Sequence, residues 1–213
     1  MPSNSPIRRR VSILSLCLKW ILPFILLLIA ILCIWQSYHA PVTKPDEAIA
    51  LPLLQNLKKQ YHITSGHIIL VDFSKHSCEN RLYIYAAETM QVEYSGAVLH
   101  GNGRNSTDQV PEFSNEIGSN CSSVGMYKVA EPGRMRIGYP CLHMDGLDST
   151  NSNARIRGIL IHPSIRVSLL PWEMKGRNFK LSNSSNGCFA VSLHTYNKIK
   201  NLPRPIYLFA TKL

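Results

Sequence analysis

The sequence predicts a mainly β domain with a few helices, an α+β fold, preceded by one N-terminal transmembrane helix. Three observations lead to this prediction. Short apolar runs rich in Ile, Val and Tyr recur along residues 67–210 and suit strands. Helical patterns occur only at residues 46–61, where Pro52 is expected to introduce a kink, and at residues 189–200. A longer apolar run follows three arginines near the N-terminus.

The N-terminal run divides the chain into predicted parts. These are a basic cytoplasmic N-terminus (1–10), a transmembrane signal-anchor (11–35), a tether (36–50) and a folded domain (51–213). A bilayer core needs about 20 apolar residues in a helix, and every residue from Trp20 to Trp35 is apolar or proline. The arginines at positions 8–10 are expected to stay in the cytoplasm, which places the domain on the far side of the membrane.

A cleavable signal peptide is the alternative to this anchor. Cleavage would fall near Ala40, but Tyr38 occupies the position where a small residue is preferred. Cys33 follows Leu32 rather than a small residue, which argues against a lipoprotein signal. An uncleaved anchor is therefore the favoured interpretation, and secretion after cleavage is the second.

The charge of the chain favours an anionic environment. The formal net charge is +10, and the chain beyond residue 35 keeps 19 of the 23 basic residues and all 13 acidic ones, so its net charge is +6. Such a surface suits a cell-wall polymer or lipid headgroups. Nucleic acid is not an expected partner, because no basic run is interleaved with aromatic residues. The sequence leaves the oligomeric state open.

Apolar runs mark the candidate strands of the domain. They cover residues 67–73, 81–87, 92–99, 124–130, 155–161 and 206–210. Long polar stretches lie between them at residues 101–123 and 145–153. Loops of that length in a compact domain are usually functional or disordered.

A cysteine in a glycine turn carries the strongest chemical signal. The turn is Ser185-Asn186-Gly187-Cys188, and His162 stands upstream at the end of an apolar run. A thiol nucleophile and an imidazole base suffice for acyl transfer through a thioester. The glycine lets backbone N–H groups gather around an oxyanion. A helix beginning after Cys188 would lower the thiol pKa through its N-terminal dipole.

Structural alternatives exist for both residues. Cys188 could be a small buried residue or half of a disulfide, and His162 a packed histidine. The cysteines beyond the N-terminal run are Cys78, Cys121, Cys141 and Cys188, which would face an oxidising compartment. Four cysteines allow three fully paired connectivities. If Cys188 is a nucleophile, at most one disulfide forms among the other three.

No metal or other cofactor is predicted. The eight histidines include no His-x-x-x-His or Glu-flanked pair, and His62, His67 and His76 lack ligand-like spacing. A serine hydrolase also lacks support, because the chain has no Gly-x-Ser-x-Gly elbow.

An ordered series of motifs surrounds the candidate pair. In chain order the segments are Val71-Asp72-Phe73-Ser74, Arg81-Leu82-Tyr83, His100-Gly101, Phe113-Ser114-Asn115, Ser122-Ser123-Val124-Gly125-Met126-Tyr127, Asp145-Gly146-Leu147, Asn151-Ser152-Asn153-Ala154-Arg155-Ile156-Arg157, His162 and Gly187-Cys188-Phe189-Ala190-Val191. The series resembles the murein L,D-transpeptidase catalytic domain family (YkuD-type), in its Asp-Phe-Ser and double-serine subgroup. The resemblance covers roughly residues 50–213.

This resemblance implies a fold, a reaction and a set of site residues. The implied fold is an L,D-transpeptidase-like β-sandwich. The implied catalytic residues are Cys188 as nucleophile, His162 as base and Gly187 beside the oxyanion; the implied substrate-binding residues are His100, Ser122, Ser123, Arg155 and Ser185. The implied substrate is the tetrapeptide stem of peptidoglycan, cleaved between diaminopimelate and D-alanine. An amine acceptor would give cross-linking, protein attachment or D-amino-acid exchange, and water would give L,D-carboxypeptidase activity.

Each supporting residue also has a structural interpretation. His100 could be a strand-end histidine bonded to a loop carbonyl, and Ser122 and Ser123 could cap a loop. Arg155 is favoured weakly over Arg157 for gripping a carboxylate, while both could simply lie on an exposed strand face.

The sequence therefore predicts a peptidoglycan L,D-transpeptidase in the bacterial inner membrane, single-pass, with its catalytic domain in the periplasm. The alternative function is a non-catalytic or redox-regulated peptidoglycan-binding protein of the same fold. Pro163, Ser184 and Asn186 depart from the residues usual beside the family motifs and keep that alternative open.

Overall fold

The computed structural model describes residues 19, 21–32, 42–107, 109–168 and 185–213. The chain forms two compact units, Met1–Ala40 and Pro41–Leu213. In the first unit residues 21–32 are helical. No helix among the described residues is both long and apolar enough to cross a membrane. Much of the predicted anchor (11–18, 20 and 33–35) and residues 36–41 of the predicted tether lie outside the described residues.

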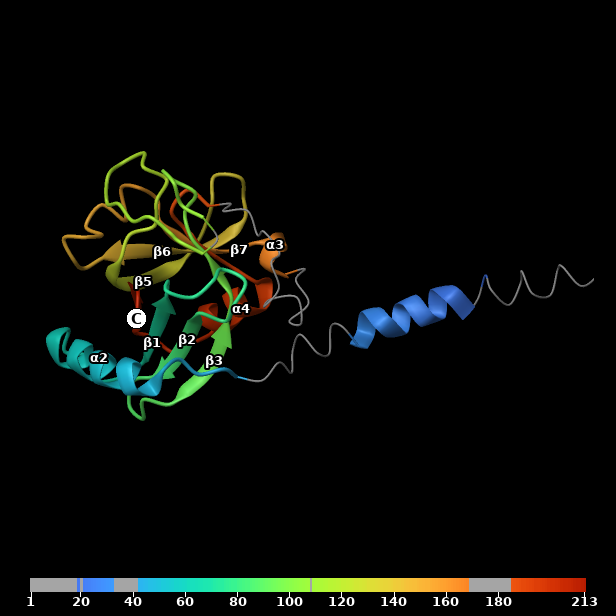
Figure 1. Cartoon of the computed structure of the whole chain (residues 1–213), viewed down its shortest axis with the longest axis horizontal. Helices are drawn as coiled ribbons and strands as arrows, with labels where there is room; N and C mark the ends of the chain where they lie inside the picture. Colours follow the sequence, from blue (N-terminus) through green and yellow to red (C-terminus); the bar gives the residue numbers. More distant parts are fainter. Residues whose placement is uncertain (1–18, 20, 33–41, 108, 169–184) are drawn as a thin grey trace, which may run out of the picture. The chain divides into compact units, whose positions relative to one another are not determined.

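One curled sheet organises the second unit (Figure 1). Its strands are β1 (His67–Asp72), β2 (Leu82–Ala86), β3 (Val92–Gly96), β4 (Val98–Leu99), β5 (Gly125–Arg134), β6 (Pro140–Gly146), β7 (Leu160–Pro163), β8 (Phe189–Val191) and β9 (Ile206–Thr211). Their order across the sheet is β3-β2-β1-β9-β5-β6-β7-β8-β4. The helices of this unit are α2 (Glu47–Gln60), α3 (Ile165–Ser168) and α4 (Leu193–Lys200).

The sheet must curl because its two edge strands are joined in sequence. β3 and β4 stand at opposite ends of the strand order, yet only Ala97 separates them along the chain. The expected β-sandwich is therefore one continuous sheet closed on itself rather than two separate sheets. Side chains from most of the strands fill its interior, among them Ile69, Leu142, Ile161 and Phe189.

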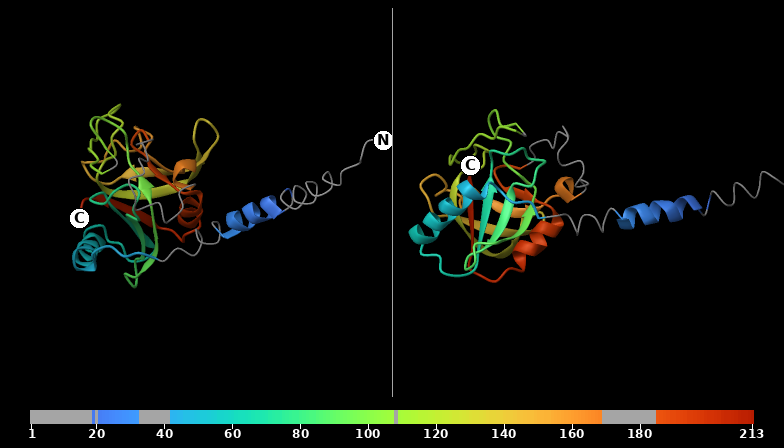
Figure 2. Two further views of the ribbon diagram at one scale, coloured as in Figure 1. Left: turned by 45° about the vertical axis from the view of Figure 1, so that its right-hand side comes forward. Right: turned by 60° about the horizontal axis from the view of Figure 1, so that its bottom comes forward.

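Helix α2 covers the outside of the sheet (Figure 2). Asp46 caps it by accepting the Ala48 N–H, and Ala50, Leu54 and Leu57 form its buried face. The helix expected over residues 46–61 is thereby confirmed, and it continues through Pro52. The buried face packs against strand residues that point away from the interior, including Ile68, Leu70, Tyr83 and Tyr85.

Two sequence predictions of secondary structure are wrong in ways that affect the site. Residues 155–158 form turns rather than a strand, with Ile156 exposed and Gly158 at a φ of +65°. Residues 189–200 are not one helix: the chain forms β8 first, and α4 begins at Leu193 after the N-cap Ser192. Strand β6 was not predicted.

Replacing Leu54 should show how much the α2 layer contributes. Leu54 is fully buried, whereas Ile49 on the same helix is 50% exposed. We expect Leu54→Ala to lower the free energy of unfolding by about 3 kcal/mol, because it leaves a cavity. Ile49→Ala should change it by less than about 0.5 kcal/mol. Urea unfolding of both variants measures this, and equal losses would contradict the packing described for α2.

Candidate active site

The predicted nucleophile, Cys188, lies immediately before β8 and is 9% exposed. Its thiol donates to the Gly158 carbonyl, with an Sγ···O distance of 3.6 Å. The Ser185 hydroxyl donates to the carbonyl of Cys188 itself at 2.7 Å. The Ser185 side chain thus closes the turn, and the Cys188 sulfur lies next to Gly158, shortly before β7.

The surroundings of Cys188 keep its thiol protonated at neutral pH. Burial raises the pKa of the Cys188 thiol, while the backbone of Leu160 and the positive charge of Arg157 oppose the rise. The predicted contribution of a helix dipole is wrong, since β8 separates Cys188 from α4. At rest Cys188 is therefore a thiol rather than a thiolate.

His162 lies on the strand beside Cys188. Strands β7 and β8 pair in parallel, with Ile161 opposite Phe189 and His162 opposite Ala190. Ile161 and Phe189 belong to the interior core. Because side chains alternate along a strand, His162 and Cys188 both project from the other face, on neighbouring strands.

The imidazole of His162 is oriented by a backbone carbonyl. Its Nδ1 lies 3.0 Å from the oxygen of Pro163. A carbonyl oxygen can only accept a hydrogen bond, so Nδ1 carries the proton. In the neutral ring the lone pair is then on Nε2, as a general base requires.

Residues outside the glycine turn hold it in place through hydrogen bonds. Ser122 accepts the Gly101 N–H at 2.9 Å and donates to the Gly187 carbonyl at 3.1 Å. The Asn102 N–H donates to the Ser185 carbonyl at 2.9 Å. Ser122 and Ser185 are both buried, and their hydroxyls bond to the protein itself. Their predicted substrate-binding role stays a prediction.

Only glycine fits at position 187. Its φ is +106°, which L side chains rarely adopt. An added Cβ would lie 2.7 Å from the Cys121 carbonyl oxygen, 2.9 Å from Ile159 Cδ1 and 3.1 Å from Arg157 Nη2. The turn is therefore enclosed on the side facing these residues.

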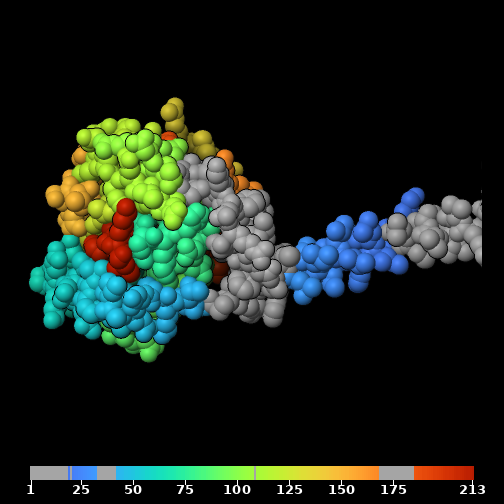
Figure 3. All heavy atoms as spheres, in the orientation of Figure 1, coloured from blue at the N-terminus to red at the C-terminus, as the bar shows by residue number. Residues whose placement is uncertain are grey.

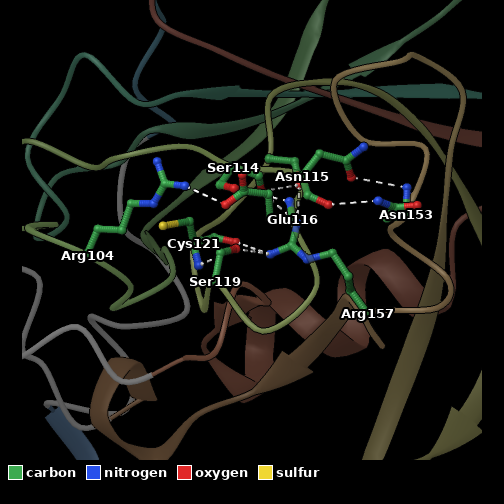
Figure 4. A network of polar contacts seen from close by, with 9 residues as sticks. Arg104, Ser114, Asn115, Glu116, Ser119, Cys121, Asn153 and Arg157 are labelled. Carbon is green, nitrogen blue, oxygen red and sulfur yellow. Dashed lines mark hydrogen bonds and ion pairs between the residues drawn. The ribbon is translucent and has the colours of Figure 1, made fainter.

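Ser123 bonds to Arg157, and Figure 4 shows Arg157 with Ser114, Ser119 and Cys121, other members of the same polar network. The Ser123 hydroxyl accepts from Arg157 Nη1 at 2.6 Å and donates to the Ser114 carbonyl at 3.2 Å. Ser123 belongs to the segment between β4 and β5, which is drawn in yellow-green and lies at the top of the space-filling view (Figure 3). The structure thus places Ser123 beside Arg157; binding of substrate by Ser123 stays a prediction.

Arg155, which the sequence favoured over Arg157, lies on the turn before β7 and faces a carboxylate of the protein. Its Nε and Nη2 bond to the two Asp145 oxygens at 2.6 and 2.8 Å. This pairing holds the pKa of the Asp145 carboxyl below its usual range. Alternating apolar neighbours suggested a strand here, and the nearby Asn151, Asn153 and Gly158 were the turn signal that sequence reasoning missed.

His100 lies inside the protein at 1% exposure. Arg81 Nη2 donates to its Nδ1 at 2.7 Å, so its Nε2–H donates to the Thr107 carbonyl at 2.9 Å. Burial and the neighbouring Arg81 charge lower the pKa of His100 to about 3. His100 is therefore neutral and has the strand-end arrangement that was the structural alternative; its substrate-binding role stays a prediction.

Three cysteines of the second unit are free thiols in the structure. They are Cys121, Cys141 and Cys188. Burial raises the thiol pKa of Cys121 and Cys141. Cys141, Leu160 and Cys188 belong to one small buried cluster with Met135 against it. Among the described residues no group of three or more His, Cys, Asp or Glu is arranged to hold a metal ion.

A curled β sheet presenting a cysteine and a histidine on adjacent strands defines a candidate cysteine acyltransferase. Residues 46–210 match the family model of the L,D-transpeptidase catalytic domain, and the chain belongs to this family. The predicted family is thereby confirmed.

Two solved structures are similar to this chain. One is an L,D-transpeptidase (residues 123–326) from Xylanimonas cellulosilytica DSM 15894, with 16% identity over 70% of this chain and 61% of that one, at a TM-score of 0.41. The other is an L,D-transpeptidase from Mycobacterium tuberculosis H37Rv, with 17% identity over 70% of this chain and 58% of that one, at a TM-score of 0.36. The chain thus covers less than two thirds of either protein. A comparison with curated proteins gave no match.

Substitution of Gly187 tests the enclosed turn. We expect Gly187→Ala to cost about 3 kcal/mol in free energy of unfolding, since strain at positive φ adds to the clash with the Cys121 carbonyl. Gly138 is the matched control, because its φ is +84° but an added Cβ would meet nothing within 4 Å. Gly138→Ala should cost about 1 kcal/mol, from strain alone. Urea unfolding compares them, and a smaller loss for Gly187→Ala would show that the turn can relax.

His100 should make the domain sensitive to mild acid. The unfolded chain takes up a proton at this ring near pH 6.5, whereas the folded chain does so only near pH 3. Stability is therefore present above pH 6.5 and is lost as the pH falls toward 3. Between pH 7 and pH 5 this single group should remove about 2 kcal/mol. His100→Gln should lose about that much less than the wild type in urea unfolding at the two pH values; parallel losses would refute this role.

Proposed function

We propose that the protein is a peptidoglycan L,D-transpeptidase with Cys188 as its nucleophile and His162 as its general base. The observation that carries this proposal is the parallel pairing of β7 with β8, which puts both side chains on one face of adjacent strands. The proposed acyl donor is a tetrapeptide stem. Its diaminopimelate carbonyl, at the L-centre, is attacked by sulfur.

Proton transfer begins from the thiol of Cys188 rather than from a thiolate. The thiol of Cys188 donates a hydrogen bond to the Gly158 carbonyl, and the Nδ1–H of His162 donates one to the Pro163 carbonyl. As the sulfur–carbon bond forms, Nε2 takes the thiol proton and the imidazole becomes imidazolium. When the amide bond breaks, the imidazolium returns a proton to the amine of D-alanine, which leaves. A thioester at Cys188 remains.

The glycine turn supplies the environment for the oxyanion. We assign the backbone N–H of Cys188, helped by that of Gly187, as donors to the tetrahedral intermediate. In the second step an acceptor amine attacks the thioester and His162 accepts its proton; the carbon–sulfur bond then breaks, and the imidazolium returns that proton to the sulfur of Cys188. The product is a cross-link, an attached protein or an exchanged D-amino acid. Water as acceptor gives carboxypeptidase activity.

The proposed substrate lies outside the cytoplasm, and we propose the same location for the domain. The support is the sequence: three arginines at positions 8–10 precede an apolar run that reaches Trp35. Residues 11–35 would anchor the chain in the inner membrane, with the domain in the periplasm. N-terminal sequencing of the protein isolated from cells separates this from cleavage near Ala40.

A non-catalytic peptidoglycan-binding protein is the second candidate. The observation that favours it is the 9% exposure of Cys188 together with its raised thiol pKa, since both slow a nucleophile. Binding without acylation of the thiol would be its signature.

The deciding experiment is intact-mass spectrometry of the full chain with a tetrapeptide stem and with a carbapenem. A carbapenem offers a strained amide carbonyl to the same nucleophile. We expect a stem adduct that lacks D-alanine, a carbapenem adduct of full mass, and release of free D-alanine. Cys188→Ala should abolish all three. His162→Gln should slow D-alanine release by about 10²–10⁴-fold.

Cys78→Ala is the matched control, because Cys78 is another buried cysteine but lies in a different hydrophobic cluster from Cys188. Its adducts and turnover should match those of the wild type. A folded wild type that binds stem peptide and forms no adduct would move the assignment to the binding protein.

A further inference from the structure

The guanidinium of Arg157 joins the site to residues 114–123. Nη1 donates to the Ser114 carbonyl at 2.7 Å and to the Ser123 hydroxyl at 2.6 Å. Nη2 donates to the Ser119 hydroxyl at 3.3 Å and to the Cys121 carbonyl. Four acceptors of one loop thus converge on one side chain, which Figure 4 shows reaching across to them.

The same guanidinium packs against the turn that carries the nucleophile. Arg157 Nη2 lies 3.1 Å from the point where a side chain would begin at Gly187, and the Cys121 carbonyl that it binds lies 2.7 Å from that point. Arg157 therefore lies between residues 114–123 and the glycine turn. Its hydrogen bond to the Cys121 carbonyl is made where these two segments meet.

The backbone around Arg157 also contacts the sulfur directly. Gly158, the next residue, accepts the hydrogen bond of the Cys188 thiol. Leu160 interacts with the same thiol through its backbone. A shift of Arg157 would carry both neighbours with it, because they follow within three residues. The groups that interact with the thiol are thus Arg157, the backbone at 158 and 160, and Cys141 on β6.

We propose that Arg157 is the positioning residue of this site: it fastens residues 114–123 to the Gly187–Cys188 turn and thereby fixes where the thiol stands. The inference rests on the proposed function and adds a role for a residue that need not touch the substrate. Arg155 has the opposite placement, since its fork is occupied by Asp145 on the protein surface.

Lysine cannot replace this arginine geometrically. The planar guanidinium presents donors in a fixed fork, whereas an ammonium is a point charge on a flexible stem. Arg157→Lys therefore keeps the charge near Cys188 and loses the four-way attachment. Arg157→Met loses both, which allows the electrostatic and positional effects to be separated.

The test measures the rate at which iodoacetamide alkylates Cys188 in the full-length protein at a series of pH values. Mass spectrometry of the peptide that contains Cys188 quantifies the alkylation. We expect Arg157→Met to raise the pH midpoint by about one unit, so alkylation at pH 7 becomes about tenfold slower. In Arg157→Lys the midpoint should stay within about 0.3 unit of wild type. Amide hydrogen exchange over residues 114–123 should accelerate about tenfold or more in both variants, because the loop loses its attachment.

Stem-peptide kinetics add the readout that a purely structural role would not move. Both variants should lower kcat by about 10²-fold with KM within about twofold, since a displaced thiol affects the reaction more than binding. Arg204→Met is the control for loss of a partly buried arginine, because Arg204 binds the Val129 carbonyl and Glu131. It should leave the midpoint and the exchange of residues 114–123 unchanged.

Two results would overturn the proposal: unchanged exchange of residues 114–123, or a loss confined to KM, which would make Arg157 a substrate-binding residue. If Arg157→Met does not fold, Arg157→Lys decides through exchange and kcat. A wild type that releases no D-alanine would reject the proposed function alone, because alkylation and exchange need no peptide.

Discussion

The parallel pairing of β7 with β8 is the interaction on which the site depends. These strands follow one another along the chain, and the register of Ile161 with Phe189 decides which side chains share a face. A slip of one residue would turn either His162 or Cys188 into the core. The apolar side chains on the interior face therefore hold the catalytic geometry, although none of them reacts.

Around this pair, side chains replace the hydrogen bonds that a sheet would supply. The segments that surround the turn form few ladders, so their buried backbone groups need other partners. The Ser122 hydroxyl accepts from the Gly101 N–H and donates to the Gly187 carbonyl. The Arg157 guanidinium donates to the carbonyls of Ser114 and Cys121. Buried polar residues in this region thus convert irregular loops into a rigid frame.

The sequence predicted the parts of the fold that local patterns encode. Continuous apolar runs identified β1, β2 and β9, and the glycine turn identified Cys188. The alternation at Arg155-Ile156-Arg157 misled, because Ile156 is 75% exposed on a turn. The role of Arg157 had no local signal: its acceptors lie more than thirty residues upstream, and only the tertiary fold brings them together.

The resting chemistry follows from burial. Burial of a thiolate beside an imidazolium costs the desolvation free energy of both ions, which their attraction must offset. Cys188 lies in an apolar cluster with Leu160 and Cys141. The thiol instead stays neutral and donates to the Gly158 carbonyl. In the proposed reaction, charge would appear only when an acyl carbonyl arrives to receive the electron pair and backbone donors stabilise the oxyanion. The position of the sulfur would then limit reactivity more than its ionisation at rest, so the residues around Gly187 would matter as much as the proposed base.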